Sequence, residues 1–172
     1  LWSGQRVDWE GRWSIEEGVL APVPYRDGGP LIWSAASVPQ GIERTARNHD
    51  GWFPIGPDAA TFAQRNEAFR NAATLAGRNL EDLTTAIYLT VSVMDNAEQA
   101  EAAIDTYLEG YYQAPASALR GYQACRGGTG DQVVDFIRSF VEGGAQHVII
   151  RCVGDHDAVQ ELLCERRDEL LG

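Results

Sequence analysis

Apolar residues follow two alternating patterns along the chain. Short runs rich in β-branched and aromatic residues predict strands over residues 31–33, 49–55, 85–93 and 147–153. The longer segments that follow them carry apolar residues at helical spacing and predict helices. Strand and helix alternate four times, an order that predicts an α/β fold with a parallel sheet and helical crossovers. Such a sheet is either open or half of an eight-stranded barrel, and in both cases function belongs at the C-terminal ends of the strands.

Two segments depart from this alternation. Residues 1–28 predict an extended excursion that contains a small hairpin on either side of Gly11. Residues 110–130 predict a longer loop or lid, in which Tyr111 and Tyr112 either line a substrate or cover the rim of the sheet. The remaining pattern gives four strand–helix units over residues 29–172, within a single domain.

Charge and cysteine content narrow the possible partners. The net charge of -11 disfavours nucleic acid and anionic membranes. No apolar run reaches membrane-spanning length, and the N-terminus lacks a signal-peptide pattern. Three cysteines without close spacing predict reduced thiols in a cytoplasmic protein: Cys125, Cys152 and Cys164. All 14 basic residues are arginine, which indicates a GC-rich source genome, and the opening Leu1-Trp2-Ser3-Gly4 has the character of the middle of a longer sequence.

The clearest candidate for chemistry is the segment from Gly29 to Ser37. A predicted strand runs into a loop of small residues, and a helix follows, with Ser37 as its predicted N-cap and Pro39 in its first turn. Small side chains let a ligand approach the backbone, and the N–H groups of a helix start attract anions. The loop, formed by Ser34, Ala35, Ala36 and Ser37, is therefore either a phosphate cradle or an ordinary strand-to-helix turn.

Few other side chains suggest chemistry. Arg151 ends the last predicted strand, where its guanidinium either binds an anionic substrate or cofactor group or pairs with Asp155 or Asp157. His147 begins the same strand, at the end of the sheet that serves stability. No paired carboxylates, metal-ligand cluster or nucleophile–base pair occurs at convincing spacing. The catalytic residues therefore stay unidentified, and no metal is expected.

Four segments together resemble the C-terminal half of the luciferase-like monooxygenases, the bacterial-luciferase superfamily of flavin- or deazaflavin-dependent barrels. LWSGQRVDWEGRW at Leu1–Trp13 resembles the excursion before the fifth barrel strand. GPLIWSAAS at Gly29–Ser37 resembles the Pro-x-Ile-Trp-Ile-Gly-Gly strand, and ARNHDGWFP at Ala46–Pro54 resembles the Ala-Asp-Gly-Trp segment. GTGDQVVDFIRSFVEGGAQHVIIR at Gly128–Arg151 resembles the Gly-x-Pro-Glu-x-Val…Gly-Ala-x-His final helix and strand.

This resemblance implies a (β/α)8 TIM barrel to which the chain supplies the last four strand–helix units. It implies an oxidoreductase or monooxygenase that uses FMN or coenzyme F-420 and acts on a small-molecule substrate, and the GC-rich character favours coenzyme F-420. By position, the loop from Ser34 to Ser37 contacts the cofactor tail and its phosphate. The family's usual Gly-Gly is Ala35-Ala36 here, and Ala disfavours positive φ angles.

A second hypothesis is a non-catalytic half-barrel. A half-barrel exposes unpaired strand edges, here near residues 31–33 and 147–153. Such edges invite pairing with another chain, which would be either a second copy in a homodimer or a separate polypeptide carrying the missing N-terminal half-barrel.

Overall fold

The computed structural model describes residues 1–171 and divides the chain into two compact units, Leu1–Ile32 and Trp33–Gly172. The first unit contains the hairpin that the alternation around Gly11 predicts. Its strands, β1 (Val7–Trp9) and β2 (Ile15–Gly18), pair antiparallel, so this prediction is confirmed.

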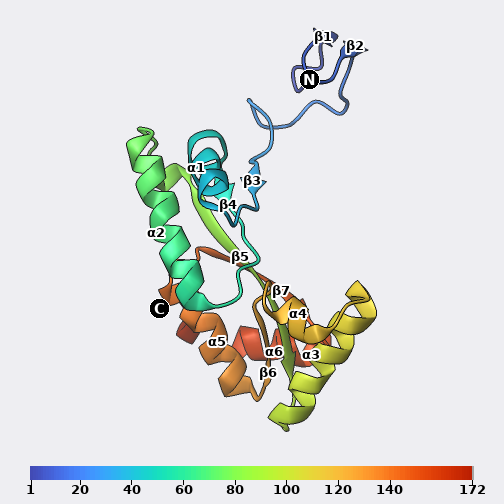
Figure 1. The fold of residues 1–172 in the computed structure, drawn as a ribbon, viewed down its shortest axis with the longest axis vertical. Coiled ribbons are helices and arrows are strands. Elements are labelled where there is room, and N and C mark those ends of the chain that lie inside the picture. The colour runs from blue at the N-terminus through green and yellow to red at the C-terminus, as the bar shows by residue number, and fades with distance from the viewer. Residues whose placement is uncertain (172) are drawn as a thin grey trace. The chain divides into compact units, whose positions relative to one another are not determined.

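The second unit is built on a parallel sheet whose central strand is β5 (Figure 1). Its strands are β3 (Trp33–Ser34), β4 (Gly51–Trp52), β5 (Thr84–Val93), β6 (Cys125–Gly128) and β7 (His147–Cys152). β3 pairs with β4, and β4 pairs with the first residues of β5. Further along β5, β6 pairs with Thr90–Val93 and β7 pairs with Ala86–Val91. Every one of these pairs is parallel, as the strand–helix alternation predicts.

β6 is a strand that the sequence pattern misses. The prediction of a loop or lid over residues 110–130 is wrong at its start, where a helix continues to Tyr112, and at Cys125–Gly128, which pairs along the C-terminal part of β5. The segment has little apolar character, so its strand forms through backbone pairing. Gly127 also allows it to lie against a helix, because a Cβ atom there would collide with the backbone of Ala100 and Glu101.

Helices follow the strands and cover the sheet. They are α1 (Pro39–Asn48), α2 (Ala59–Leu75), α3 (Ala97–Tyr112), α4 (Ala116–Arg120), α5 (Gly130–Glu142), α6 (His156–Glu165) and α7 (Arg167–Leu171), with a 3₁₀ turn η1 (Leu80–Asp82). Side-chain caps begin several of them: Asp58 accepts from the Thr61 amide at α2, and Asn96 accepts from the Gln99 amide at α3. Among residues 1–171, no helix has both the length and the apolar character that crossing a bilayer requires.

The two faces of β5 have different roles. Ile87, Leu89 and Val91 belong to the main hydrophobic core, which also contains buried aromatic residues of β4, α2 and α5. Because successive side chains of a strand point to opposite faces, Tyr88 and Thr90 lie on the other face. A second, smaller cluster joins α3 and α4. The face that carries Tyr88 is therefore the one on which polar groups of the sheet gather.

Candidate functional site

The predicted phosphate loop is tied to the core by one buried hydrogen bond. The indole Nε1 of Trp52 donates to the carbonyl oxygen of Ala36 at 2.7 Å. The Trp52 ring is fully buried and stacks on Phe62 and Phe69, at centroid distances of 5.3 and 6.0 Å. The amide of Phe53 donates to the Ser34 carbonyl at 3.1 Å. The loop is therefore held at both ends by residues of β4 and the segment after it.

The start of α1 differs from the sequence prediction. Ser37 is not the N-cap: Val38 occupies that position in an extended conformation, with Pro39 at the first helical position and no side-chain cap. The residue before a proline favours extended backbone, which explains the shift by one residue. No acidic side chain occupies the first turn, and the N–H groups of Gln40 and Gly41 have no partner within the helix. Gln40 is exposed, so its amide is open to an anion, whereas Gly41 is buried.

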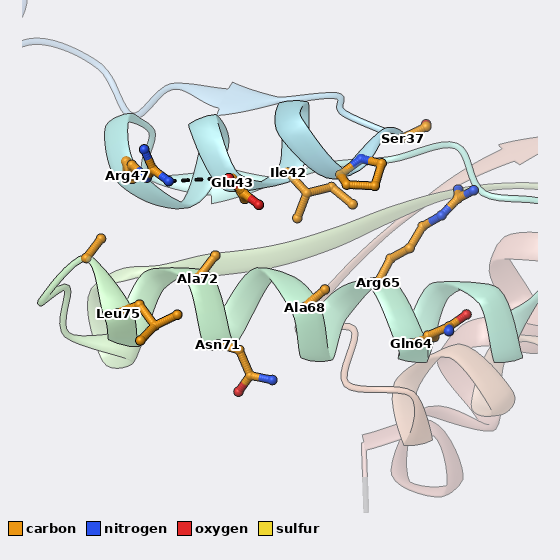
Figure 2. Close-up of a pocket in the computed structure, with 12 residues that line it drawn as sticks. Ser37, Ile42, Glu43, Arg47, Gln64, Arg65, Ala68, Asn71, Ala72 and Leu75 are labelled. Atoms are coloured by element: carbon orange, nitrogen blue, oxygen red, sulfur yellow. Dashed lines mark hydrogen bonds and ion pairs between the residues drawn. The ribbon is translucent and has the colours of Figure 1, made fainter.

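A groove of about 980 Å³ runs between α1 and α2 and reaches this helix start. Figure 2 shows Arg65 extending from α2 toward the end of the groove that Ser37 lines. In the part of the chain that the structure describes, no carboxylate oxygen lies within 4.0 Å of the Arg65 guanidinium, whereas Arg47 at the far end pairs with Glu43 at 3.3 Å. The exposed Ser37 hydroxyl, the Gln40 amide and the Arg65 guanidinium, which also interacts electrostatically with Asp58, together fit a phosphate group.

Arg151 lies in a cage of four tyrosines. Its Cζ atom is 5.0 Å from the ring centroids of Tyr88 and Tyr111 and 5.6 Å from that of Tyr107. Its Nη1 donates to the hydroxyl of Tyr112 at 3.2 Å. The expected alternative, a salt bridge to the acidic residues after β7, does not form: across residues 1–171, no carboxylate lies within 4.0 Å of this guanidinium. The arginine therefore remains an uncompensated cation among aromatic rings.

The electrostatics of the cage follow from partial burial. Burial raises the pKa of Tyr88, although the Arg151 guanidinium acts in the opposite direction. Burial acts to lower the pKa of Arg151, but the hydrogen bond to Tyr112 and the neighbouring tyrosines outweigh it and raise the pKa. Both groups therefore keep the charge they have in water, a cation and a neutral phenol, at neutral pH.

The structure does not bring the loop and Arg151 to one level of the sheet. Ser34 is level with Thr85 of β5 through β4, whereas Arg151 pairs with Thr90. The five residue steps along β5 from Thr85 to Thr90 span about 16 Å. The site thus has two separate parts, a backbone cradle at the start of α1 and the tyrosine cage.

Several residues of these parts escape the sequence analysis. Arg65, Tyr88 and Tyr107 carry no local signal, because each meets its partners only through the fold. Their positions are detectable only once α2 is placed beside α1 and α3 is placed near β7. The predicted lid residues Tyr111 and Tyr112 do lie at Arg151, which they contact by their rings and hydroxyl.

Comparisons with known proteins point to one family. The family model described as luciferase-like monooxygenase matches residues 1–170. A phthiodiolone/phenolphthiodiolone dimycocerosates ketoreductase of Mycobacterium bovis (strain BCG / Pasteur 1173P2) is 33% identical over 84 residues, which are 48% of this chain and 22% of that protein. The resemblance seen in the sequence is therefore supported along nearly its whole length.

Solved structures share the fold at low sequence identity. An F420-dependent secondary alcohol dehydrogenase in complex with an F420-acetone adduct has a TM-score of 0.78 at 14% identity, over 96% of this chain and 56% of that one. A riboflavin lyase with modified FMN and substrate riboflavin has a TM-score of 0.64 at 16% identity, over 97% and 49%. The chain thus spans about half the length of these structures, and the expected α/β barrel fold class is confirmed.

Proposed function

Because the chain belongs to the luciferase-like monooxygenase family, we propose that it binds a flavin or deazaflavin and forms part of an oxidoreductase for a small organic substrate. The observation that carries the proposal is the uncapped start of α1 beside the tethered loop Ser34–Ser37, with Arg65 directed to the same end of the groove. These groups fit the phosphate of a cofactor tail. The cofactor, once bound, supplies the redox chemistry of hydride transfer.

Within this proposal, the loop, the start of α1 and Arg65 contribute to binding in different ways. The exposed Ser37 hydroxyl and the Gln40 amide donate to phosphate oxygens, and Arg65 adds charge. Ala36 is buried and holds the loop through its carbonyl, so it shapes the cradle without facing the ligand. Gly41 keeps the helix close to the loop, because a Cβ atom there would lie 3.2 Å from that of Ala36.

We further propose coenzyme F-420 as the cofactor, ahead of FMN. The lysine-free composition, the similarity to a mycobacterial ketoreductase and the fold shared with an F420-dependent dehydrogenase all support it. Three free cysteines support a reducing, cytoplasmic location.

The test is a titration of the purified chain with coenzyme F-420 and with FMN, followed by quenching of cofactor fluorescence. We expect saturable binding of coenzyme F-420, and a loss of about tenfold in affinity for Arg65→Gln, because one charge-assisted contact is removed. Arg70→Gln is the matched control, since Arg70 is exposed on the same helix and does not line the groove. Absence of binding by both cofactors would refute the proposal.

A second candidate function is a half-barrel that assembles with another chain. It is favoured by the pairing of the described strands, in which β3 contacts only β4 and β7 contacts only β5. Each therefore leaves one edge for a further strand. Light scattering would test it: a particle of about twice the 18.9 kDa chain mass indicates a homodimer, and a single-chain mass argues against one.

A further inference from the structure

The tyrosine cage has the features of a built binding site. Its members come from three separate elements, β5, α3 and β7, so it is not a local side-chain cluster. Tyr107 and Tyr111 stack on each other at 5.7 Å, and Tyr112 meets Tyr111 edge-on at 4.8 Å. The rings are therefore fixed against one another before any ligand arrives.

Arg151 has no carboxylate partner among the described residues, whereas Arg120 and Arg126 each have at least one. Arg120 pairs with Glu101 and Asp105 at 2.7 and 2.6 Å, and Arg126 lies 3.8 Å from Glu101. Arg151 is half-buried and contacts only tyrosine rings and hydroxyls, in a chain of net charge -11 that has many carboxylates. A partly buried cation without a counter-ion gains free energy when a ligand supplies the negative charge.

A second observation points to the same place. Thr90 pairs with Arg151 across the β5–β7 register, so their side chains share one face of the sheet. Thr90 is completely buried, and its hydroxyl has the Cys125 thiol as a weak partner but no oxygen or nitrogen partner in the described part of the chain. Ser92, next on the same face, is also completely buried, and its hydroxyl has no hydrogen-bond partner among the described residues. The face around Arg151 therefore has unused donor and acceptor capacity as well as unused charge.

Aromatic rings continue from the cage along this face. Tyr88 contacts Phe53 at 6.3 Å between centroids, and Phe53 contacts Trp33 at 6.1 Å. All three side chains are half-buried. A flat apolar body bound beside Arg151 would therefore have ring surfaces to stack on.

Resting on the proposed function, we infer that the Arg151 cage is the substrate site and that it selects aryl compounds with a single carboxylate. A guanidinium offers its N–H groups in one plane, which matches the two coplanar oxygens of a carboxylate. One uncompensated cation balances one negative charge, whereas a phosphate dianion would need a second cation in this acidic chain. Tyr88, Tyr107, Tyr111 and Tyr112 then determine specificity by surrounding the head group and stacking on the aryl ring.

The experiment titrates the purified chain with benzoate, benzamide and phenyl phosphate by calorimetry, without cofactor. We expect benzoate to bind at least tenfold more tightly than benzamide, and Arg151→Gln to weaken benzoate binding about 10–100-fold, since a hydrogen-bonded charge is lost. Arg126→Gln is the control, because Arg126 also lies on a strand beside β5 but already has a carboxylate partner. Its affinity for benzoate should equal that of the parent chain.

A second variant protects the test against a folding defect of Arg151→Gln. Tyr112→Phe removes only the hydroxyl that holds Nη1, and it should weaken benzoate binding by about two- to fivefold while circular dichroism stays unchanged. Equal affinity for benzoate and benzamide, tighter binding of phenyl phosphate, or full benzoate affinity in Arg151→Gln would each overturn the inference. Failure of cofactor binding with retained benzoate binding would refute only the proposed function.

Discussion

The proposed cradle at the start of α1 and the proposed cage around Arg151 would each hold an anion, but by different means. The cradle combines a helix start with Ser37 and Arg65, and one buried indole fixes the loop beside it. The cage uses side chains from β5, α3 and β7, and it holds a cation that nothing else neutralises. The first suits a group common to many reactions, such as a cofactor phosphate, and the second suits a group that distinguishes one substrate from another.

The largest effect should come from the residue that anchors the cradle. Trp52→Ala removes a fully buried ring that stacks on Phe62 and Phe69, so we expect a loss of about 3–5 kcal/mol in the free energy of unfolding. Trp52→Phe keeps a ring but leaves the Ala36 carbonyl without its donor, at a cost of about 1–3 kcal/mol. Urea denaturation measures both. If the two variants were equally stable, the indole would be a minor anchor.

A cross-over of variants and ligands would separate the two sites. We expect Arg65→Gln to weaken the cofactor about tenfold and leave benzoate unchanged, and Arg151→Gln to do the reverse. The reason is the separation of about 16 Å along β5 between the levels of the two sites. Fluorescence quenching and calorimetry measure the two ligands. An effect of both variants on both ligands would show that the two sites are one.

A smaller effect concerns the wall of the groove. Asp58 caps α2, and its hydrogen bonds with the Thr61 amide and hydroxyl lower the pKa of its carboxyl group. A lowered pKa means that this stabilisation is present above the ordinary value of 3.8 and is lost as the pH falls through the lower value of the folded state. Asp58→Ala should therefore cost about 1 kcal/mol at pH 7.

This cost should decrease as the pH falls below 3.8 and through the lower pKa of the folded state, because the parent carboxyl then becomes protonated as well. Urea denaturation at several pH values measures it. Glu67→Ala, an exposed change on the same helix, is the control. A cost that did not change with pH would mean that Asp58 acts through something other than its charge.

The smallest effect tests the departure from the family's Gly-Gly. Within residues 1–171, the only non-glycine residues with positive φ are Glu17 and Gln113, so Ala35 and Ala36 adopt ordinary backbone conformations. Ala35→Gly should therefore destabilise the chain by about 0.5–1 kcal/mol, through the larger freedom of the unfolded state. Thermal denaturation measures this. Stabilisation instead would indicate that the alanine strains the loop.

Features that depend on residues close together in the sequence are predictable from it, and features that depend on distant residues are not. The loop, α1 and the alternation of strands and helices depend on neighbours, so their patterns are visible in the chain. Even there, the helix start was misplaced by one residue, because Pro39 moved the N-cap from Ser37 to Val38. The sequence predicts Arg151 as a cation at the end of a strand, but it does not indicate which tyrosines surround it.

Each feature that the sequence analysis missed depends on contacts between residues far apart in the chain. β6 has two glycines and little apolar character, and it exists because β5 offers a backbone edge and α3 leaves room only for a glycine. Tyr88 is 63 residues from Arg151 in sequence and next to it in space. Arg65 reaches the end of the groove that Ser37 lines only because α2 lies along α1. Such contacts leave no periodic pattern in the sequence, since they arise from how the helices and strands pack.

β5 carries Tyr88 of the cage and pairs with three other strands, and this has a consequence for how the chain can change during evolution. Inserting or deleting one residue between Thr84 and Val93 would exchange its two faces, sending Tyr88 and Thr90 into the core and Ile87 and Leu89 out of it. The cage around Arg151 would lose Tyr88 in the same event. Natural length variation should therefore accumulate in the connection between α4 and β6 and avoid this strand.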